Sequence, residues 1–323
     1  MLFGAVNPAG RLAETFPLKL EDAACYRYFP GEPRRVQYRE GLYVGYRYFD
    51  TVGKEVLFPF GYGLSYTSFD YSGMMLSKSD IDADEPMTMS VTVKNTGSAA
   101  GHEVVQLYVH DVESAVYRPA HELKGFEKVF LEPGESREVV FTLDRRSFAF
   151  YDVQSREWQV EPGNFEVQIG SSSRDIRLRV QCSVRSSYRP DAERADPVEY
   201  ARPAARDFTV SDASFAALLG RHITPTEPLR PFHINSTLGE VKDTAIGGLV
   251  YRQALKEAIK KSGDDLDESS LRMIDAMVRE MPLRGIVLFS GGQFGYGLVE
   301  GVIHMLNGKY AGGLLRMLGL VKN

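Results

Sequence analysis

The sequence is poor in the residues that carry disulfide and metal chemistry. Only two cysteines occur among 323 residues, Cys25 and Cys182, and they form no CxxC pair. This spacing supports neither a disulfide scaffold nor a zinc knot, and it fits a reducing compartment. The six histidines show no HExxH motif and no paired-ligand spacing. We therefore expect no metal and no cofactor.

Long apolar runs and an excess of positive charge are also missing. No stretch reaches the roughly 18 consecutive apolar residues of a membrane-spanning helix. The chain has 38 basic and 43 acidic residues and a formal net charge of −5. It therefore offers no overall positive field to a polyanion, and nucleic acid is not an expected partner. The N-terminus lacks the basic and apolar regions of a signal peptide, so we expect a cytoplasmic protein that does not enter a membrane.

Apolar and aromatic residues, by contrast, are plentiful. Hydrophobic residues make up 43% of the chain, and there are 18 Phe and 17 Tyr, which is enough for a substantial core. A single core stops growing at roughly 250–300 residues, so the length favours two or more folded units.

The middle of the chain, residues 69–184, alternates apolar and polar residues with a period of two. Short alternating runs, joined by Gly and Pro turns at roughly 8–12-residue spacing, predict an immunoglobulin-like or fibronectin type III-like β-sandwich. The expected strands are residues 87–93, 104–110, 121–130, 139–143, 148–151, 158–160, 165–169 and 176–180.

The flanking segments have other patterns. Residues 1–68 show little helical periodicity and predict loops and short strands, with too few apolar positions to close a core alone. Residues 185–240 predict a linker with one short helix, which Ser211 begins and Gly220 ends. Residues 241–323 have helical periodicity and predict a small helical extension.

Three strings in the first 69 residues are the most informative part of the sequence. They are NPAGRLAETFP at residues 7–17, YREGLYVGYRYFD at residues 38–50 and LFPFGYGLSYTSF at residues 57–69. In this order and spacing they resemble the C-terminal part of bacterial glycoside hydrolase family 3 β-glucosidases. The string HELKGF at residues 121–126 is similar to the fibronectin type III-like domain of that family, and the C-terminal helices are similar to an extension on some bacterial members.

The resemblance implies a mainly β fold with four parts. Residues 1–68 would be the irregular C-terminal remnant of the family's α/β sandwich domain, and residues 69–184 its fibronectin type III-like β-sandwich. Residues 185–240 would be a linker, and residues 241–323 the α-helical extension.

The resemblance also implies a reaction. Members of the family hydrolyse β-linked glycosides with retention. They use an Asp nucleophile on an N-terminal TIM barrel and a Glu acid/base on the α/β sandwich that follows it, well upstream of the string at residues 7–17. Neither residue has a counterpart here, so we assign no catalytic residue and expect the isolated chain to be inactive. The expected partner is a polypeptide that carries the barrel and the rest of the α/β domain, with a β-glucoside as substrate of the complete enzyme.

Four residues of the second string are candidates for substrate contact, namely Tyr38, Glu40, Tyr43 and Arg47. Glu40 lies between tyrosines, whose rings can stack on sugar faces. Arg47 could orient a sugar hydroxyl or a carboxylate. The other interpretation is that Glu40 pairs with Arg39, Arg47 or another basic residue and fixes the loop.

The alternative function is a non-catalytic module that binds carbohydrate or a partner protein. It depends on the aromatic residues between positions 38 and 49 being exposed. Exposure of Tyr43, Tyr46 and Tyr48 on an apolar patch would mark such an interface.

Overall fold

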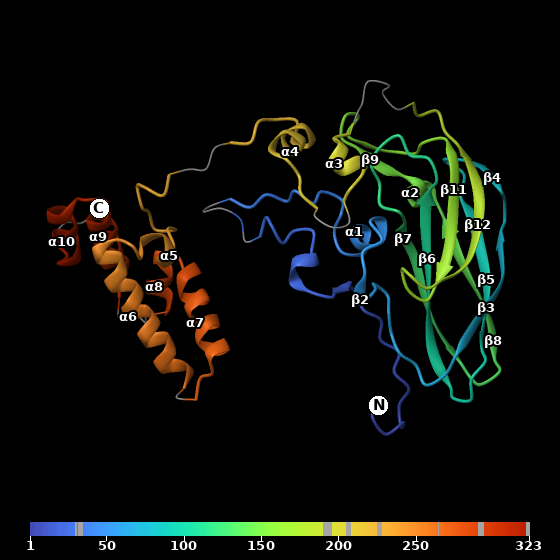
Figure 1. Cartoon of the computed structure of the whole chain (residues 1–323), viewed down its shortest axis with the longest axis horizontal. Coiled ribbons are helices and arrows are strands. Elements are labelled where there is room, and N and C mark those ends of the chain that lie inside the picture. The colour runs from blue at the N-terminus through green and yellow to red at the C-terminus, as the bar shows by residue number, and fades with distance from the viewer. Residues whose placement is uncertain are drawn as a thin grey trace. The chain divides into compact units, whose positions relative to one another are not determined.

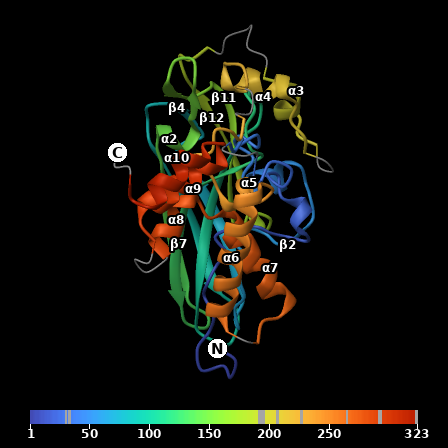
Figure 2. The same cartoon turned by 90° about the vertical axis from the view of Figure 1, so that its left-hand side faces the viewer.

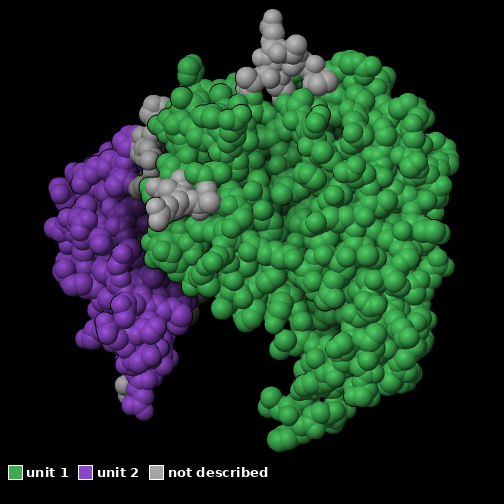
Figure 3. All heavy atoms as spheres, turned by 45° about the vertical axis from the view of Figure 1, so that its right-hand side comes forward, with its two compact units in different colours: residues 1–30, 36–224 green, residues 31–35, 225–323 purple. Residues whose placement is uncertain are grey.

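A computed structural model describes residues 1–29, 31, 35–189, 196–204, 208–224, 228–263, 265–289 and 294–320. The chain divides into two compact units, which Figure 1 shows as ribbons and Figure 3 in two colours. The first unit comprises residues 1–30 and 36–224, and the second comprises residues 31–35 and 225–323. The first unit is rich in strands and the second is helical.

The predicted β-sandwich is confirmed in the first unit (Figures 1 and 2). A five-stranded sheet has the order β4-β12-β11-β6-β7, and a three-stranded sheet has the order β3-β5-β8. Neighbouring strands are antiparallel except β4 and β12, which are parallel. The strands are β3 (Phe69–Leu76), β4 (Asp80–Asp82), β5 (Met87–Asn95), β6 (Gly101–Asp111), β7 (Glu122–Leu131), β8 (Ser136–Leu143), β11 (Gly163–Gly170) and β12 (Ile176–Arg185).

The apolar residues that recur at every second position fill the sandwich core. In β5 the side chains of Met87, Met89, Val91 and Val93 are buried and alternate with more exposed positions. These residues pack in one cluster with apolar side chains of the five-stranded sheet. Alternate burial of this kind is expected for a strand with one face on a core and one toward solvent.

Strand β6 is different, because both of its faces are buried. Val105 and Leu107 belong to the sandwich core, whereas Gln106 and Tyr108 point to the opposite face and are equally inaccessible to solvent. This part of the outer face is therefore covered, and the cover includes Tyr46, whose ring packs on Tyr108, and Gly61, whose carbonyl oxygen accepts a hydrogen bond from Gln106.

Those residues contain one helix that the sequence did not predict. Helix α1 (Tyr46–Thr51) follows Gly45, whose φ of 56° favours glycine, and lies between the paired strands β1 (Phe16–Pro17) and β2 (Val56–Phe58). Our expectation of loops and short strands was wrong at this point. The helix has aromatic residues of modest helix propensity, so its stability comes from tertiary packing. A single 3₁₀ turn, η1 (Leu20–Asp22), precedes it.

The strand expected at residues 148–151 is replaced in part by a helix. Helix α2 (Arg145–Phe148) begins with a capping box, in which Asp144 and Ser147 each bond the other's backbone N–H. These bonds favour a helical turn over the alternation. Strand β9 (Phe150–Asp152) starts after it and pairs with β10 (Glu157–Gln159).

Part of the segment predicted as a linker is packed into the first unit. It forms α3 (Val198–Ala201) and α4 (Asp212–Leu219), and α4 begins after Ser211 and ends at Gly220 as expected. The buried cluster that it joins contains Tyr43, Tyr48, Phe49, Tyr200, Phe208, Val210 and Phe215. The returning chain thus packs against the segment that carries α1.

The second unit is a small helical domain, in line with the predicted extension. Its helices are α5 (Leu238–Val241), α6 (Ala245–Ser262), α7 (Glu268–Glu280), α8 (Leu283–Phe289), α9 (Tyr296–Leu306) and α10 (Tyr310–Met317). Helices α9 and α10 cross closely, because a Cβ atom at Gly301 would lie 2.7 Å from the Gly313 carbonyl oxygen. Among the described residues, none of the helices has the length and apolar content needed to cross a membrane.

Candidate functional site

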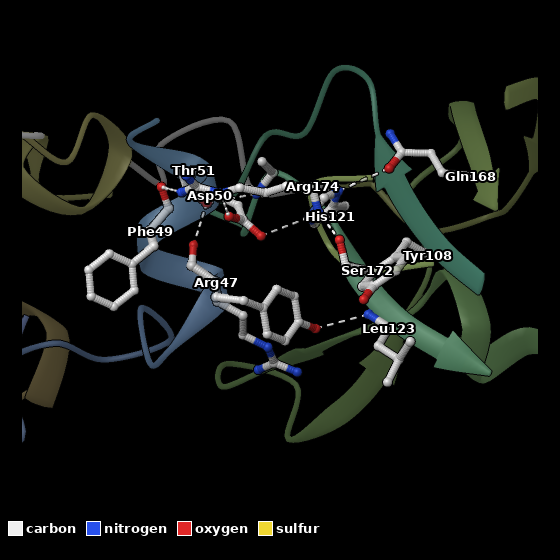
Figure 4. Close-up of polar contacts among 12 residues, drawn as sticks. Arg47, Phe49, Asp50, Thr51, Tyr108, His121, Leu123, Gln168, Ser172 and Arg174 are labelled. Carbon is white, nitrogen blue, oxygen red and sulfur yellow. Dashed lines mark hydrogen bonds and ion pairs between the residues drawn. The ribbon is translucent and has the colours of Figure 1, made fainter. Parts of the chain in front are cut away.

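Helix α1 is held on the outer face of the five-stranded sheet by polar side chains (Figure 4). The Tyr46 hydroxyl accepts a hydrogen bond of 2.9 Å from the Leu123 N–H, and the Thr51 hydroxyl accepts one of 2.8 Å from the Ala120 N–H. Leu123 lies at the start of β7, the edge strand of this sheet, and Ala120 lies two residues before that strand. The second sequence string, at residues 38–50, therefore helps to hold residues 1–68 on the β-sandwich.

Asp50 is the centre of this α1 interface. Its carboxylate accepts hydrogen bonds from Arg174 Nε at 2.6 Å and from His121 Nε2 at 3.3 Å. Burial alone would raise the pKa of Asp50, but the hydrogen bonds from His121 and Arg174 outweigh it and hold that pKa below its ordinary value. Asp50 therefore acts as an ionised acceptor that fixes α1.

His121 links Asp50 to the sheet. Its Nδ1 lies 2.9 Å from Gln168 Oε1, and the Gln168 amide nitrogen donates to Glu166 at 2.7 Å, which fixes the amide orientation. His121 thus bridges Asp50 of α1 and Gln168 of β11 through its two ring nitrogens. The Tyr108 ring lies 4.9 Å from the imidazole and packs beneath it.

A second group of charges contains the predicted residue Arg47. Its guanidinium lies 3.8 Å from the Glu122 carboxylate, which also binds Arg118 at 2.9 Å and Lys124 at 3.1 Å. Burial alone would raise the pKa of Glu122, but the neighbouring Lys124 and Arg118 outweigh it and hold that pKa below its ordinary value. Arg47 is half-exposed and belongs to this structural charge cluster.

The two predicted tyrosines have different surroundings. Tyr38 is 72% exposed, whereas Tyr43 is only 1% exposed. The Tyr43 ring packs against Phe208, and its hydroxyl donates a hydrogen bond of 2.6 Å to the Tyr200 carbonyl oxygen. Burial raises the pKa of the Tyr43 hydroxyl above its ordinary value. Tyr43 thus packs in a buried aromatic cluster, and its predicted contact with substrate stays a prediction.

Glu40 lines a cleft of about 430 Å³ in the first unit, which we call the Glu40 cleft. The walls are mainly apolar and aromatic, and they include Thr15, Cys25, Tyr43, Tyr46 and Phe60. Glu40 itself is 8% exposed, and among the described residues its Oε2 atom has no hydrogen-bond partner. Glu14 also lines the cleft, but its side chain is exposed.

The expected pairing of Glu40 with Arg39 or Arg47 was wrong. Arg39 donates to Asp212 and to the Val210 carbonyl, and it lies over the ring of Phe215. Arg47 turns to the charge cluster on β7. The substrate-contact roles of Tyr38, Glu40 and Arg47 stay predictions.

Sequence reasoning missed Asp50 and His121 as partners. The available signal was their position inside two of the informative strings, at residues 38–50 and 121–126. The α1 interface is a structural connection, because its buried charges pair with one another, whereas the Glu40 cleft has polar atoms left to satisfy.

Comparison with known proteins matches the chain to one family model and to parts of longer proteins. Residues 103–173 match the family model of the fibronectin type III-like domain. The chain is 43% identical over 307 residues to "Thermostable beta-glucosidase B" of Acetivibrio thermocellus, an alignment that covers 95% of this chain and 36% of the relative. It is 46% identical over 176 residues to an "Exo-alpha-(1->6)-L-arabinopyranosidase" of Bifidobacterium breve, with 54% of this chain and 23% of the relative covered.

A solved structure supports the same relationship. The crystal structure of a GH3 beta-glucosidase of Bifidobacterium adolescentis matches with a TM-score of 0.56 at 35% identity, over 77% of this chain and 31% of that chain. The chain therefore spans about a third or less of the length of the relatives it matches.

Proposed function

Since the chain corresponds to the C-terminal portion of a glycoside hydrolase family 3 β-glucosidase, we propose that it forms the closing part of an enzyme that hydrolyses β-linked glycosides. The observation that carries this proposal is the 307-residue match, which takes in 95% of the chain. In this proposal residues 1–68 complete an α/β domain, and α1 fastens that domain to the β-sandwich.

The catalytic carboxyl groups are proposed to lie outside this chain. A retaining glycosidase needs two carboxyl groups about 5–5.5 Å apart across the scissile bond. The polypeptide that carries the TIM barrel and the rest of the α/β domain would supply both, as a preceding segment or as a separate chain. Exposed apolar side chains in residues 1–68 support a partner that packs over them. They include Leu2, Phe3, Leu20, Phe29 and Tyr38.

The proposed substrate is a β-glucoside. Most of the relatives are named as β-glucosidases, although those of Bifidobacterium breve and Bifidobacterium longum are named for an arabinopyranoside linkage. The alternative, a binding module that uses the aromatic residues 38–49, has less support. Tyr43 and Tyr48 are each only 1% exposed, whereas such a module depends on these rings being exposed on an apolar patch.

A chimera tests the proposal. This chain would replace the matching portion of the Acetivibrio thermocellus relative, and hydrolysis of an aryl β-glucoside would be measured for the chimera and for the chain alone. We expect turnover by the chimera and none by the chain alone. A folded chimera without turnover, or a purified chain that hydrolyses the substrate, would contradict the proposal.

We also propose a cytoplasmic location. Both cysteines are free, and Cys25 is exposed, which suits a reducing compartment. Fractionation of the source cells with an antibody to the chain tests this, and recovery outside the cytoplasm would contradict it.

A further inference from the structure

We propose that the Glu40 cleft receives a basic side chain, lysine or arginine, from the part of the enzyme that precedes this chain. The inference rests on the proposed function, because it names the chemistry by which the rest of the α/β domain would dock. The occupant would insert between the aromatic walls and bring its charge to the Glu40 carboxylate.

The first argument is the unsatisfied polarity of the cleft. Glu40 and Thr15 are each 8% exposed, and among the described residues neither Glu40 Oε2 nor Thr15 Oγ1 has a hydrogen-bond partner. Both side chains line the same cleft. Buried polar atoms in native structures nearly always have partners, so two orphans in one cleft indicate that a donor is supplied from elsewhere.

The second argument is charge. A carboxylate removed from water is strongly disfavoured unless a cation compensates it. Arg39 and Arg47 do not compensate the charge of Glu40, because Arg39 binds Asp212 and Arg47 lies beside Glu122. A sugar hydroxyl could donate a hydrogen bond to Glu40, but it would leave the negative charge uncompensated. A lysine or arginine supplies both the donor and the charge.

The third argument is the shape and lining of the cleft. Tyr46 and Phe60 stack on each other with ring centroids 4.7 Å apart, and both line the cleft. Aromatic walls suit the aliphatic stem of a basic side chain and its cationic end. The volume of about 430 Å³ exceeds that of one side chain, so neighbouring apolar residues of the occupant would fill the remainder.

Cys25 provides a built-in measurement of occupancy. It is an exposed free cysteine that lines the same cleft. Its alkylation by iodoacetamide, followed by mass spectrometry of the Cys25 peptide, would be compared between the full chain alone and the chimera. We expect the rate to fall at least about tenfold in the chimera, because the docked segment covers the thiol.

The charge is tested by Glu40→Gln, which keeps the size of the side chain. In the chimera this change should raise the unfolding equilibrium constant about 30-fold or more, because it leaves a buried cation without its counter-charge. In the full chain alone the same change should raise the melting temperature, because it removes an uncompensated charge. Glu14→Gln is the matched control, since Glu14 lines the cleft but is exposed, and it should alter neither protein.

The outcomes separate the two proposals. An inactive, folded chimera counts against the proposed function. An active chimera in which Cys25 reacts as fast as in the chain alone, or in which Glu40→Gln changes stability no more than Glu14→Gln does, overturns the inference about the cleft. Protection of Cys25 in the chain alone by millimolar glucose, lost in Glu40→Gln, would show a sugar site and would also overturn it.

Discussion

Replacement of Asp50 by alanine should detach α1 from the β-sandwich. The carboxylate is 6% exposed and binds Arg174 at 2.6 Å and His121 at 3.3 Å. Hydrogen bonds to charged groups contribute about 1.5–3 kcal/mol each, and Arg174 is partly exposed, so its share is reduced by solvent screening. We expect Asp50→Ala to lower the free energy of unfolding by about 2–4 kcal/mol, and Asp50→Asn by about half of that.

The assay is urea unfolding followed by tryptophan fluorescence. Trp158 is the single tryptophan of the chain and lies on β10, so the signal reports on the first unit alone. Asp70→Ala is the control, because Asp70 is an exposed residue of β3 and should cost no more than about 0.5 kcal/mol. An Asp50→Ala cost equal to that of the control would refute the view that Asp50 fixes α1.

The pH dependence gives an independent check. The folded-state pKa of Asp50 is lowered, so its contribution is fully present above the ordinary value of about 3.9 and is lost as the pH falls through the folded value. The stability difference between the native protein and Asp50→Asn should therefore be constant near neutral pH and shrink below about pH 4. A difference that stays unchanged at about pH 2 would contradict the assigned role.

Three further predictions concern other parts of the chain. Burial raises the pKa of Cys182 to about 11, so at pH 8 roughly a thousandth of this thiol is ionised. Iodoacetamide should therefore modify the exposed Cys25 and spare Cys182, and equal labelling of the two cysteines would contradict this. Asn95 is fully buried and uses both ends of its amide, so Asn95→Ala should cost about 2–4 kcal/mol by Trp158 fluorescence, and a cost below about 1 kcal/mol would count against it. Thr237→Ala breaks the capping box of α5 and should cost about 1 kcal/mol in the helical unit by circular dichroism, without moving the Trp158 transition.

Local signals in the sequence predicted much of the fold. The alternation at residues 104–110 and 165–169 became β6 and β11, which are neighbours in one sheet. Helix α4 was predicted from its ends, because a serine that caps the first turn and a glycine that closes the last turn act within a few residues. Such features depend on neighbours in sequence and can be read from it directly.

The features that were missed depend on contacts between distant residues. Helix α1 is held in place in part by Asp50, which binds Arg174, a residue 124 positions later. The burial of Tyr43 depends on Tyr200 and Phe208, which the sequence placed in a linker. A distant residue also explains why Arg39 does not pair with Glu40. Arg39 binds Asp212, which lies 173 positions later in the chain. No local pattern reports a partner more than a hundred residues away.

The return of the chain to its starting segment has a consequence for synthesis on the ribosome. Tyr43, Tyr48 and Phe49 leave the ribosome first, and their buried neighbours Phe208, Val210 and Phe215 are made roughly 160 residues later. At about 5–20 residues per second, the early segment waits on the order of 8–30 seconds for its cover. During that interval its tyrosines and phenylalanines are open to chaperones and to other nascent chains, so the yield of native protein should depend on the speed of translation through the sandwich.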